Sequence, residues 1–162
     1  MNIGTKQLIE ITGISAVVLS LIFVAWELRQ SNRIAIATAE TDLRSANREL
    51  ISLVADNSIL AAVIVKARDT SVQMNSTEQE IFKSYARASF NILSQANAAF
   101  ENGLLTTYSL DIYRNRITRD LDIDPALINH FAQTVRDFDL HLSNTELWNY
   151  LVDELRSRGL EF

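Results

Sequence analysis

Residues 11–26 read ITGISAVVLSLIFVAW and contain no charged side chain. As a helix, these sixteen residues span about 24 Å, somewhat less than the roughly 30 Å hydrocarbon core of a bilayer. Extension to residues 8–28 gives 21 residues and about 31 Å, with Glu10 and Glu27 near the headgroups. The stretch is apolar on every side of the helix, which is typical of a transmembrane segment. The sequence therefore predicts a transmembrane helix within residues 1–30.

A buried core helix and a cleaved signal peptide are alternative interpretations of this stretch. A core helix stays open, because sixteen uncharged residues lie near the lower limit for a span. A signal peptide fits less well, since Lys6 is the only basic residue before the stretch and no A-x-A-like site follows it. The transmembrane interpretation is the one we prefer.

The charges that flank the stretch indicate its orientation. Four arginines follow it within about twenty residues, whereas only Lys6 precedes it. By the positive-inside rule, the C-terminal domain is expected to be cytoplasmic and the N-terminus outside, in a bacterial-type inner membrane. Trp26 and Arg29 are the expected anchors at the cytoplasmic interface. The four arginines are Arg29, Arg33, Arg44 and Arg48.

Small side chains recur every four residues within the predicted span, at Thr12, Ala16 and Ser20, with Gly13 beside them. Such a stripe lets two helix backbones approach closely in lipid, where packing drives helix association. It predicts an intramembrane contact, either with a second copy of the chain or with a different membrane subunit.

A second periodic pattern follows the span. No Gly or Pro occurs between Gly13 and Gly103, and apolar residues alternate in steps of three and four over residues 36–53. This spacing predicts a long juxtamembrane helix over residues 31–56. Its apolar stripe fits a coiled-coil seam between chains and, equally well, the core-facing side of a helix in a bundle. The stripe comprises Ile36, Ala39, Leu43, Ala46, Leu50 and Leu53.

Composition favours an all-α fold for the rest of the chain. Four Gly and one Pro in 162 residues are too few turn residues for a β-rich fold. Helical periodicity predicts a bundle of about four to five helices over residues 57–162. The cytoplasmic domain is thus expected to cover residues 31–162. Side chains expected in its core include Phe82, Phe90, Leu110, Ile117, Phe131, Phe138, Leu147 and Leu151.

Capping signals mark the expected ends of these helices. A helix break is expected at 56–58, and helix stops are expected at Asn102-Gly103 and at Gly159. The expected N-terminal caps are Ser76 or Thr77 with Gln79 or Glu80, Thr106 or Thr107, Asp124 before Pro125, and Ser143 with Glu146.

Few residues carry the signature of a reactive or metal-binding site. The chain has no Cys, which excludes disulfides, thiolate metal sites and cysteine nucleophiles. Residues 120–124 form a D-x-D-x-D pattern, but Pro125 stands where a calcium-binding loop needs Gly. The histidines His130 and His141 lack the spacing of a metal-ligand pair. We therefore expect no catalytic residue, no metal and no cofactor.

Arg114, Arg116 and Arg119 form a basic cluster in a chain whose net charge is −5. The overall negative charge argues against nucleic acid as a partner. The cluster itself suits contact with anionic lipid headgroups or with a phosphate ligand. The alternative is that these arginines pair with Asp111 and Asp120, which lie three and four residues away on the same helix.

Two short phrases resemble a group of small bacterial single-pass membrane proteins with a C-terminal helical domain. They are WELRQSN at residues 26–32 and AFENGLL at residues 99–105. The resemblance extends loosely over the whole chain and implies one N-terminal span followed by a helical domain. It implies no activity and supplies no catalytic residue.

Together these patterns predict a non-enzymatic, single-pass membrane protein whose cytoplasmic helical domain mediates assembly. It would be a homo-oligomeric scaffold or an accessory subunit of a larger membrane complex, with membrane lipid and other chains as partners. One alternative is an oligomeric pore, whose polar lining would be the hydroxyl side chains of the span. Another is a sensor or ligand-binding bundle with a pocket among Phe82, Tyr85, Phe90 and Phe131.

Overall fold

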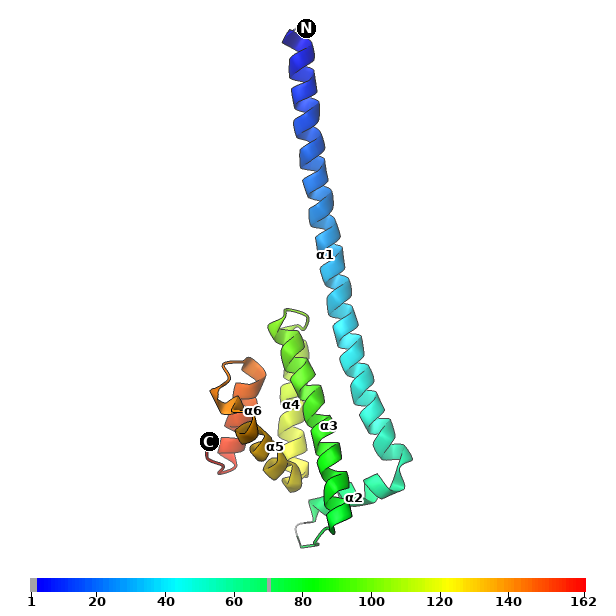
Figure 1. Cartoon of the computed structure of the whole chain (residues 1–162), viewed down its shortest axis with the longest axis vertical. Helices are drawn as coiled ribbons and strands as arrows, with labels where there is room; N and C mark the ends of the chain where they lie inside the picture. Colours follow the sequence, from blue (N-terminus) through cyan, green and yellow to red (C-terminus); the bar gives the residue numbers. More distant parts are fainter. Residues whose placement is uncertain (1–2, 70) are drawn as a thin grey trace. The chain divides into compact units, whose positions relative to one another are not determined.

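The computed structural model describes residues 3–69 and 71–162, without the side chains of residues 3 and 5–9. Lys6 and the first residues of the predicted span therefore lie outside the described side chains. Every regular element in the described residues is a helix, which confirms the all-α prediction (Figure 1). The elements are α1 (Ile3–Asp56), α2 (Ser58–Arg68), α3 (Ser76–Glu101), α4 (Thr107–Ile123), α5 (Pro125–Asp137), the short 3₁₀ helix η1 (Leu140–Leu142) and α6 (Glu146–Ser157).

The chain divides into two compact units, Met1–Thr38 and Ala39–Phe162. The boundary that the sequence predicts between residues 30 and 31 is the end of the expected membrane span, which this division does not test. Leu43 is the first fully buried side chain along the described part of α1. The last turns of α1 thus belong to the same compact unit as the bundle.

In the N-terminal unit, residues 3–38 are helical throughout. All described side chains from Glu10 to Ile34 are exposed, including every apolar one. Among the described helices, α1 is the one that is long and apolar enough to cross a membrane, by length and composition. The alternative of a buried core helix does not describe this stretch, since the described chain buries none of it.

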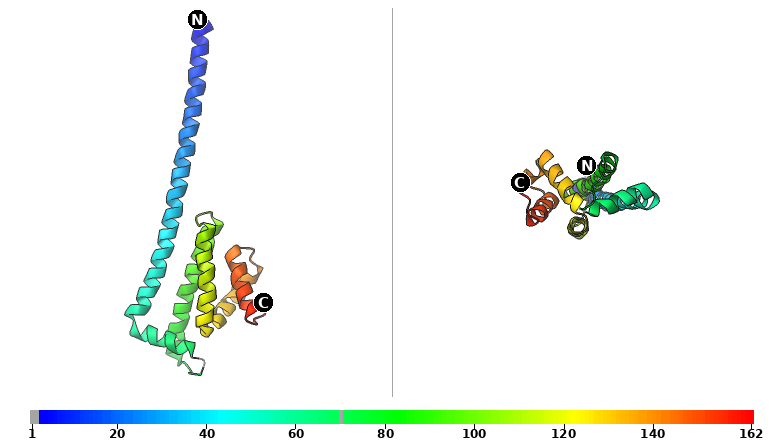
Figure 2. Two further views of the ribbon diagram at one scale, coloured as in Figure 1. Left: turned by 180° about the vertical axis from the view of Figure 1, so that it is seen from behind. Right: turned by 90° about the horizontal axis from the view of Figure 1, so that it is seen from below.

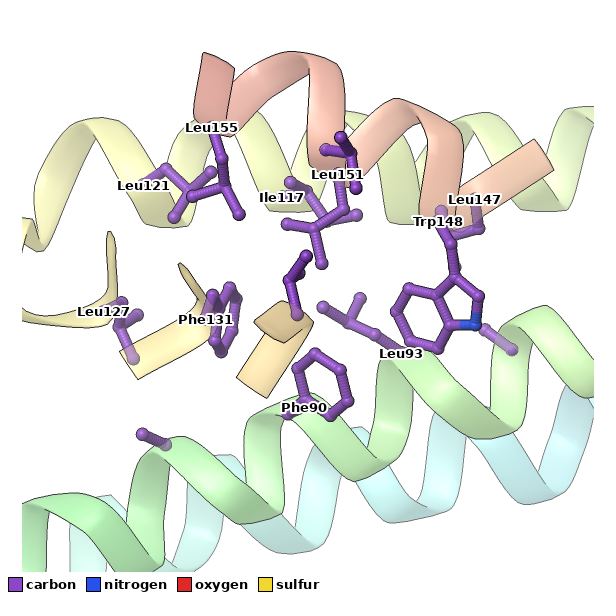
Figure 3. Packing of buried hydrophobic residues seen from close by; sticks show 14 of the residues in the cluster. Phe90, Leu93, Ile117, Leu121, Leu127, Phe131, Leu147, Trp148, Leu151 and Leu155 are labelled. Carbon is purple, nitrogen blue, oxygen red and sulfur yellow. The ribbon is translucent and has the colours of Figure 1, made fainter. Parts of the chain in front are cut away.

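The C-terminal unit is a helical bundle with a continuous apolar core. Helices α3 and α4 lie side by side, and α5 and α6 pack against both (Figures 1 and 2). Figure 3 shows the centre of this core, where Phe90 stacks on Trp148 and meets Phe131 edge-on. The most deeply buried large side chains are Phe131, Leu93, Leu110, Ile117, Leu121, Leu147, Leu151 and Leu155.

Several predicted helix ends are confirmed. The side chain of Asn57 accepts hydrogen bonds from the backbone N–H groups of Ile59 and Leu60, and so separates α1 from α2. Gly103 follows α3 with a φ of 69°, and Gly159 follows α6 with a φ of 86°. Both glycines occupy the left-handed conformation that terminates helices and that other residues rarely adopt.

Two predicted caps are shifted along the chain. The cap of α3 is Asn75, whose side chain accepts from the N–H of Glu78 while Glu78 accepts from the N–H of Asn75. The cap position of α6 is Thr145, and Ser143 instead ends η1. Both shifts arise because adjacent Asn, Ser and Thr residues can all cap a helix, so composition alone does not choose among them.

One predicted core residue is wrong. Phe138 is 71% exposed, although its spacing on α5 matched the buried face. The reason is local: α5 ends at Asp137, and Asp139 adopts a left-handed φ of 51°, which turns the chain away from the core at this point. Conversely, Leu127 and Trp148 are buried without having been expected there.

Candidate functional site

The small-residue stripe lies on the exposed surface of α1. Thr12, Gly13, Ala16 and Ser20 are all exposed in the N-terminal unit. The hydroxyl of Ser20 donates a hydrogen bond of 2.8 Å to the backbone carbonyl of Ala16. Because this hydroxyl is satisfied within the helix, the stripe offers a partner chiefly close van der Waals packing.

The interface anchors are exposed as well. Trp26 packs its ring beside Phe23, with 6.3 Å between the ring centroids, and Arg29 extends one turn further along α1. An aromatic pair followed by an arginine is the arrangement expected where a span meets the headgroup region.

The apolar residues of the juxtamembrane stripe are buried to different degrees. Leu43 and Leu50 are buried within the C-terminal unit, as the core-facing interpretation of the stripe predicts. Leu53 is exposed. The remaining members, Ile36, Ala39 and Ala46, are half-buried.

Arg116 is the centre of a polar network inside the bundle. Its side chain is 13% exposed, and its Nε donates to Asp120 at 3.1 Å. Its two Nη groups donate to Asn47 Oδ1 at 2.6 Å and to Ser89 Oγ at 3.2 Å. One guanidinium thus joins α1, α3 and α4, with each of its three nitrogens donating a hydrogen bond. Nearby, Ser109 donates to Glu40 at 2.6 Å and links α4 to α1 a second time.

The other two arginines of the basic cluster differ in their ion pairs and in their exposure. Arg114 donates to Asp111 at 2.8 Å and pairs with Glu146 at 2.7 Å. The hydrogen bond with Glu146 raises the pKa of the Arg114 guanidinium further. Arg119 is 66% exposed and only 3.4 Å from Asp120. Arg119 is therefore the member of the cluster with most freedom to meet an external anion.

A cleft of about 480 Å³ lies within the C-terminal unit, between the end of α1 and α4. Its walls combine polar side chains, among them Arg116 and Asn47, with the apolar side chains of Leu43, Leu105 and Ile112. Its lining residues include Glu40, Arg44, Asn47, Ser109, Tyr113, Asn115, Arg116 and Arg119.

The three acids of the D-x-D-x-D pattern each face an arginine. Besides the pair of Asp120 with Arg116, Asp122 pairs with Arg158 at 2.6 Å and Asp124 with Arg68 at 3.8 Å. Within the described residues, no group of three or more acids or histidines is placed to hold a metal ion. The pattern therefore serves ion pairs between distant parts of the chain.

Asp124 is the buried member of this pattern. Its side chain is almost fully buried, and its Oδ1 has no hydrogen-bond partner among the described residues. Burial raises the pKa of this carboxyl, although the charge of Arg68 acts in the opposite direction. The folded protein therefore holds the Asp124 proton more tightly than the unfolded chain does.

Replacing Asp124 with asparagine tests how much the ionised, buried carboxylate destabilises the folded protein. A raised pKa in the folded state penalises the ionised form, so the wild type loses stability as the pH rises through that pKa, and the asparagine variant does not. We expect the variant to gain about 1 kcal/mol relative to wild type between about pH 4 and pH 7, the size of a buried unsatisfied group. Urea unfolding at both pH values measures this, and a stability difference that does not change with pH would contradict it.

A second cleft, of about 710 Å³, lies between α3, α5, η1 and α6. Its walls include the aromatic side chains Phe90, Phe138 and Trp148, together with Arg87 and His130. Burial, reinforced by the charges of Arg87 and Lys83, lowers the pKa of His130, which favours the neutral imidazole.

The pocket expected among four aromatic residues does not assemble as one cavity. Phe82 and Phe131 are buried in the core, and Tyr85 lines a separate shallow groove beside α2. Phe90 alone of the four lines the second cleft. Sequence periodicity pointed to the right helix but not to Arg87, His130 or Phe138, whose proximity depends on how α3 and α5 pack.

Comparison of the chain with protein-family models, with curated proteins and with solved structures gives no match. The function is therefore argued from the chain's own surfaces.

Proposed function

We propose that this chain is a non-enzymatic, single-pass membrane protein whose C-terminal helical domain mediates assembly. The observation that carries the proposal is the uncovered apolar segment of α1, where every described side chain from Glu10 to Ile34 is exposed. A soluble protein seldom leaves an apolar surface of this length in water, whereas a bilayer covers it completely. The arginines that follow the segment favour a cytoplasmic C-terminal domain.

The C-terminal unit offers surface for assembly. Besides Leu53, the apolar side chains of Ile51, Ile59 and Val65 are exposed around the end of α1 and along α2. Exposed apolar side chains on these two helices can contribute to a protein interaction surface. By contrast, Arg114, Arg116 and Arg158 form ion pairs with acids of the same chain, which supports a structural role for these arginines.

Fractionation and mass measurement test the proposal directly. We expect the full-length protein in the membrane fraction, and a defined multimer by size exclusion with light scattering in mild detergent. A clean monomer would instead favour the role of an accessory subunit, whose partner is then sought by pull-down from native membranes. Recovery in the soluble fraction without detergent would contradict the membrane anchor itself.

Bulky side chains on the small-residue stripe should disrupt an intramembrane contact. We expect the double variant A16I/S20I to shift a multimer towards monomer, because isoleucine keeps the helix backbones apart. Ala25→Ile is the matched control, since residue 25 lies about 180° around the helix from residue 16. Light scattering in mild detergent reads out both variants, and an unchanged multimer in A16I/S20I would exclude the stripe as the contact.

A sensor or ligand-binding bundle is the second candidate function. The observation that favours it is the aromatic cleft between α3, α5 and α6, which has a volume suited to a small molecule.

A further inference from the structure

Two of the aromatic side chains that line the aromatic cleft stack on each other. Phe90 and Trp148 stack with 5.1 Å between their ring centroids and 5° between their planes (Figure 3). The cleft volume of about 710 Å³ falls within the range of natural small-molecule sites. Aromatic side chains that line such a cleft suit contact with another aromatic ring.

One wall of the cleft is an aromatic side chain that the core does not use. Phe138 lines the cleft and is largely exposed, because the chain turns at Asp139 immediately after α5. An exposed phenylalanine leaves apolar surface uncovered on one side of the cavity, beside the buried pair of Phe90 and Trp148. This surface is what an apolar ring would cover.

Three polar side chains of the cleft have no partner among the described residues. Among the described residues, none forms a hydrogen bond or ion pair with the side chains of Arg87, Asn91 or Ser94, although all three line the cleft. The acid in the cleft, Asp137, already accepts a hydrogen bond of 2.6 Å from Gln133. Arg87 is therefore the uncommitted charge of the cleft, and a guanidinium forms a strong bidentate pair with a carboxylate.

We propose that this cleft binds a small aromatic carboxylate. The ring of such a molecule lies against Phe138 and the part of Trp148 that lines the cleft, and its carboxylate pairs with Arg87. The imidazole of His130, which also lines the cleft, supplies one further hydrogen bond. This site goes beyond the proposed assembly function and does not depend on it.

The test uses the full-length protein in mild detergent with 2-naphthoate as the probe and the uncharged 2-naphthamide as its comparison. In a Trp26→Phe background, Trp148 is the single tryptophan, so its emission reports on the cleft. We expect saturable quenching by 2-naphthoate, with calorimetry giving the same Kd and 2-naphthamide binding at least tenfold more weakly. A titration into detergent alone corrects for partitioning of the probe.

Two variants and one control decide the outcome. Arg87→Gln should weaken 2-naphthoate binding at least tenfold without changing that of 2-naphthamide, and Phe138→Ala should weaken the binding of both. Arg156→Gln, on the exposed surface of α6, should leave both unchanged. Absence of saturable quenching, or equal 2-naphthoate binding in Arg87→Gln and wild type, would overturn the proposal.

Discussion

Replacing Phe131 with alanine should lower the free energy of unfolding of the C-terminal unit by about 3–5 kcal/mol. Phe131 is 1% exposed, and its ring meets Phe90 edge-on with 5.5 Å between centroids. The substitution removes the buried ring and leaves a cavity at the centre of the core, and both effects destabilise the fold. Urea unfolding of the full-length protein in mild detergent measures the change, with Trp148 emission as the signal in a Trp26→Phe background.

Phe138→Ala is the matched control for this prediction. The same chemical change is made close by in sequence, at a side chain that is 71% exposed. We expect a loss below about 0.5 kcal/mol, because an exposed side chain gains little from burial. Similar losses in the two variants would show that the core is not centred on Phe131.

This pair of residues also illustrates what periodicity can and cannot predict. Spacing along α5 placed Phe131 in the core correctly, since a helix repeats its inward face every three to four residues. The same spacing failed for Phe138, because the helix ends one residue earlier and the repeat no longer applies. Helical periodicity predicts burial only within a helix. No Gly follows α5, so the sequence has no signal for the end of this helix.

Helix boundaries could be predicted where a single residue carries a strong local signal. Asn57, Gly103 and Pro125 each have a conformational or hydrogen-bonding preference strong enough to set a boundary alone, and each prediction is confirmed. Asn75 and Thr145 stand beside other residues with a similar capping preference, so composition did not choose among them.

Only some contacts of the candidate sites could be predicted from the sequence. The local pairs of Arg114 with Asp111 and of Arg116 with Asp120 follow from helical spacing and were anticipated. The contact of Arg116 with Asn47 joins residues 69 positions apart. Helical periodicity relates only residues within one helix and cannot predict a contact over such a separation. Neither the network nor the aromatic cleft could therefore be predicted from the sequence.

Replacing Arg116 with methionine should destabilise the C-terminal unit by about 2–3 kcal/mol. Methionine keeps most of the length of the side chain but donates no hydrogen bond, so Asn47, Ser89 and Asp120 each lose a partner. Partly buried acceptors without partners cost more than the bond itself contributes. The same urea titration measures the loss.

Arg119→Met is the control, because Arg119 also pairs with Asp120 but is 66% exposed. An exposed pair contributes about 0–1 kcal/mol, so the two variants should differ clearly although both remove a charge next to the same acid. Equal losses would mean that the charge of the pair matters and the network does not.

A double-mutant cycle between Arg116→Met and Asn47→Ala separates the contact with α1 from the rest of the network. Asn47 lies on α1, whereas the other two acceptors lie on α3 and α4. If the network joins the end of α1 to the bundle, the two substitutions are coupled by about 0.5–3 kcal/mol. Additive effects would instead assign the attachment of α1 to Leu43 and Leu50, the two stripe residues that are already buried.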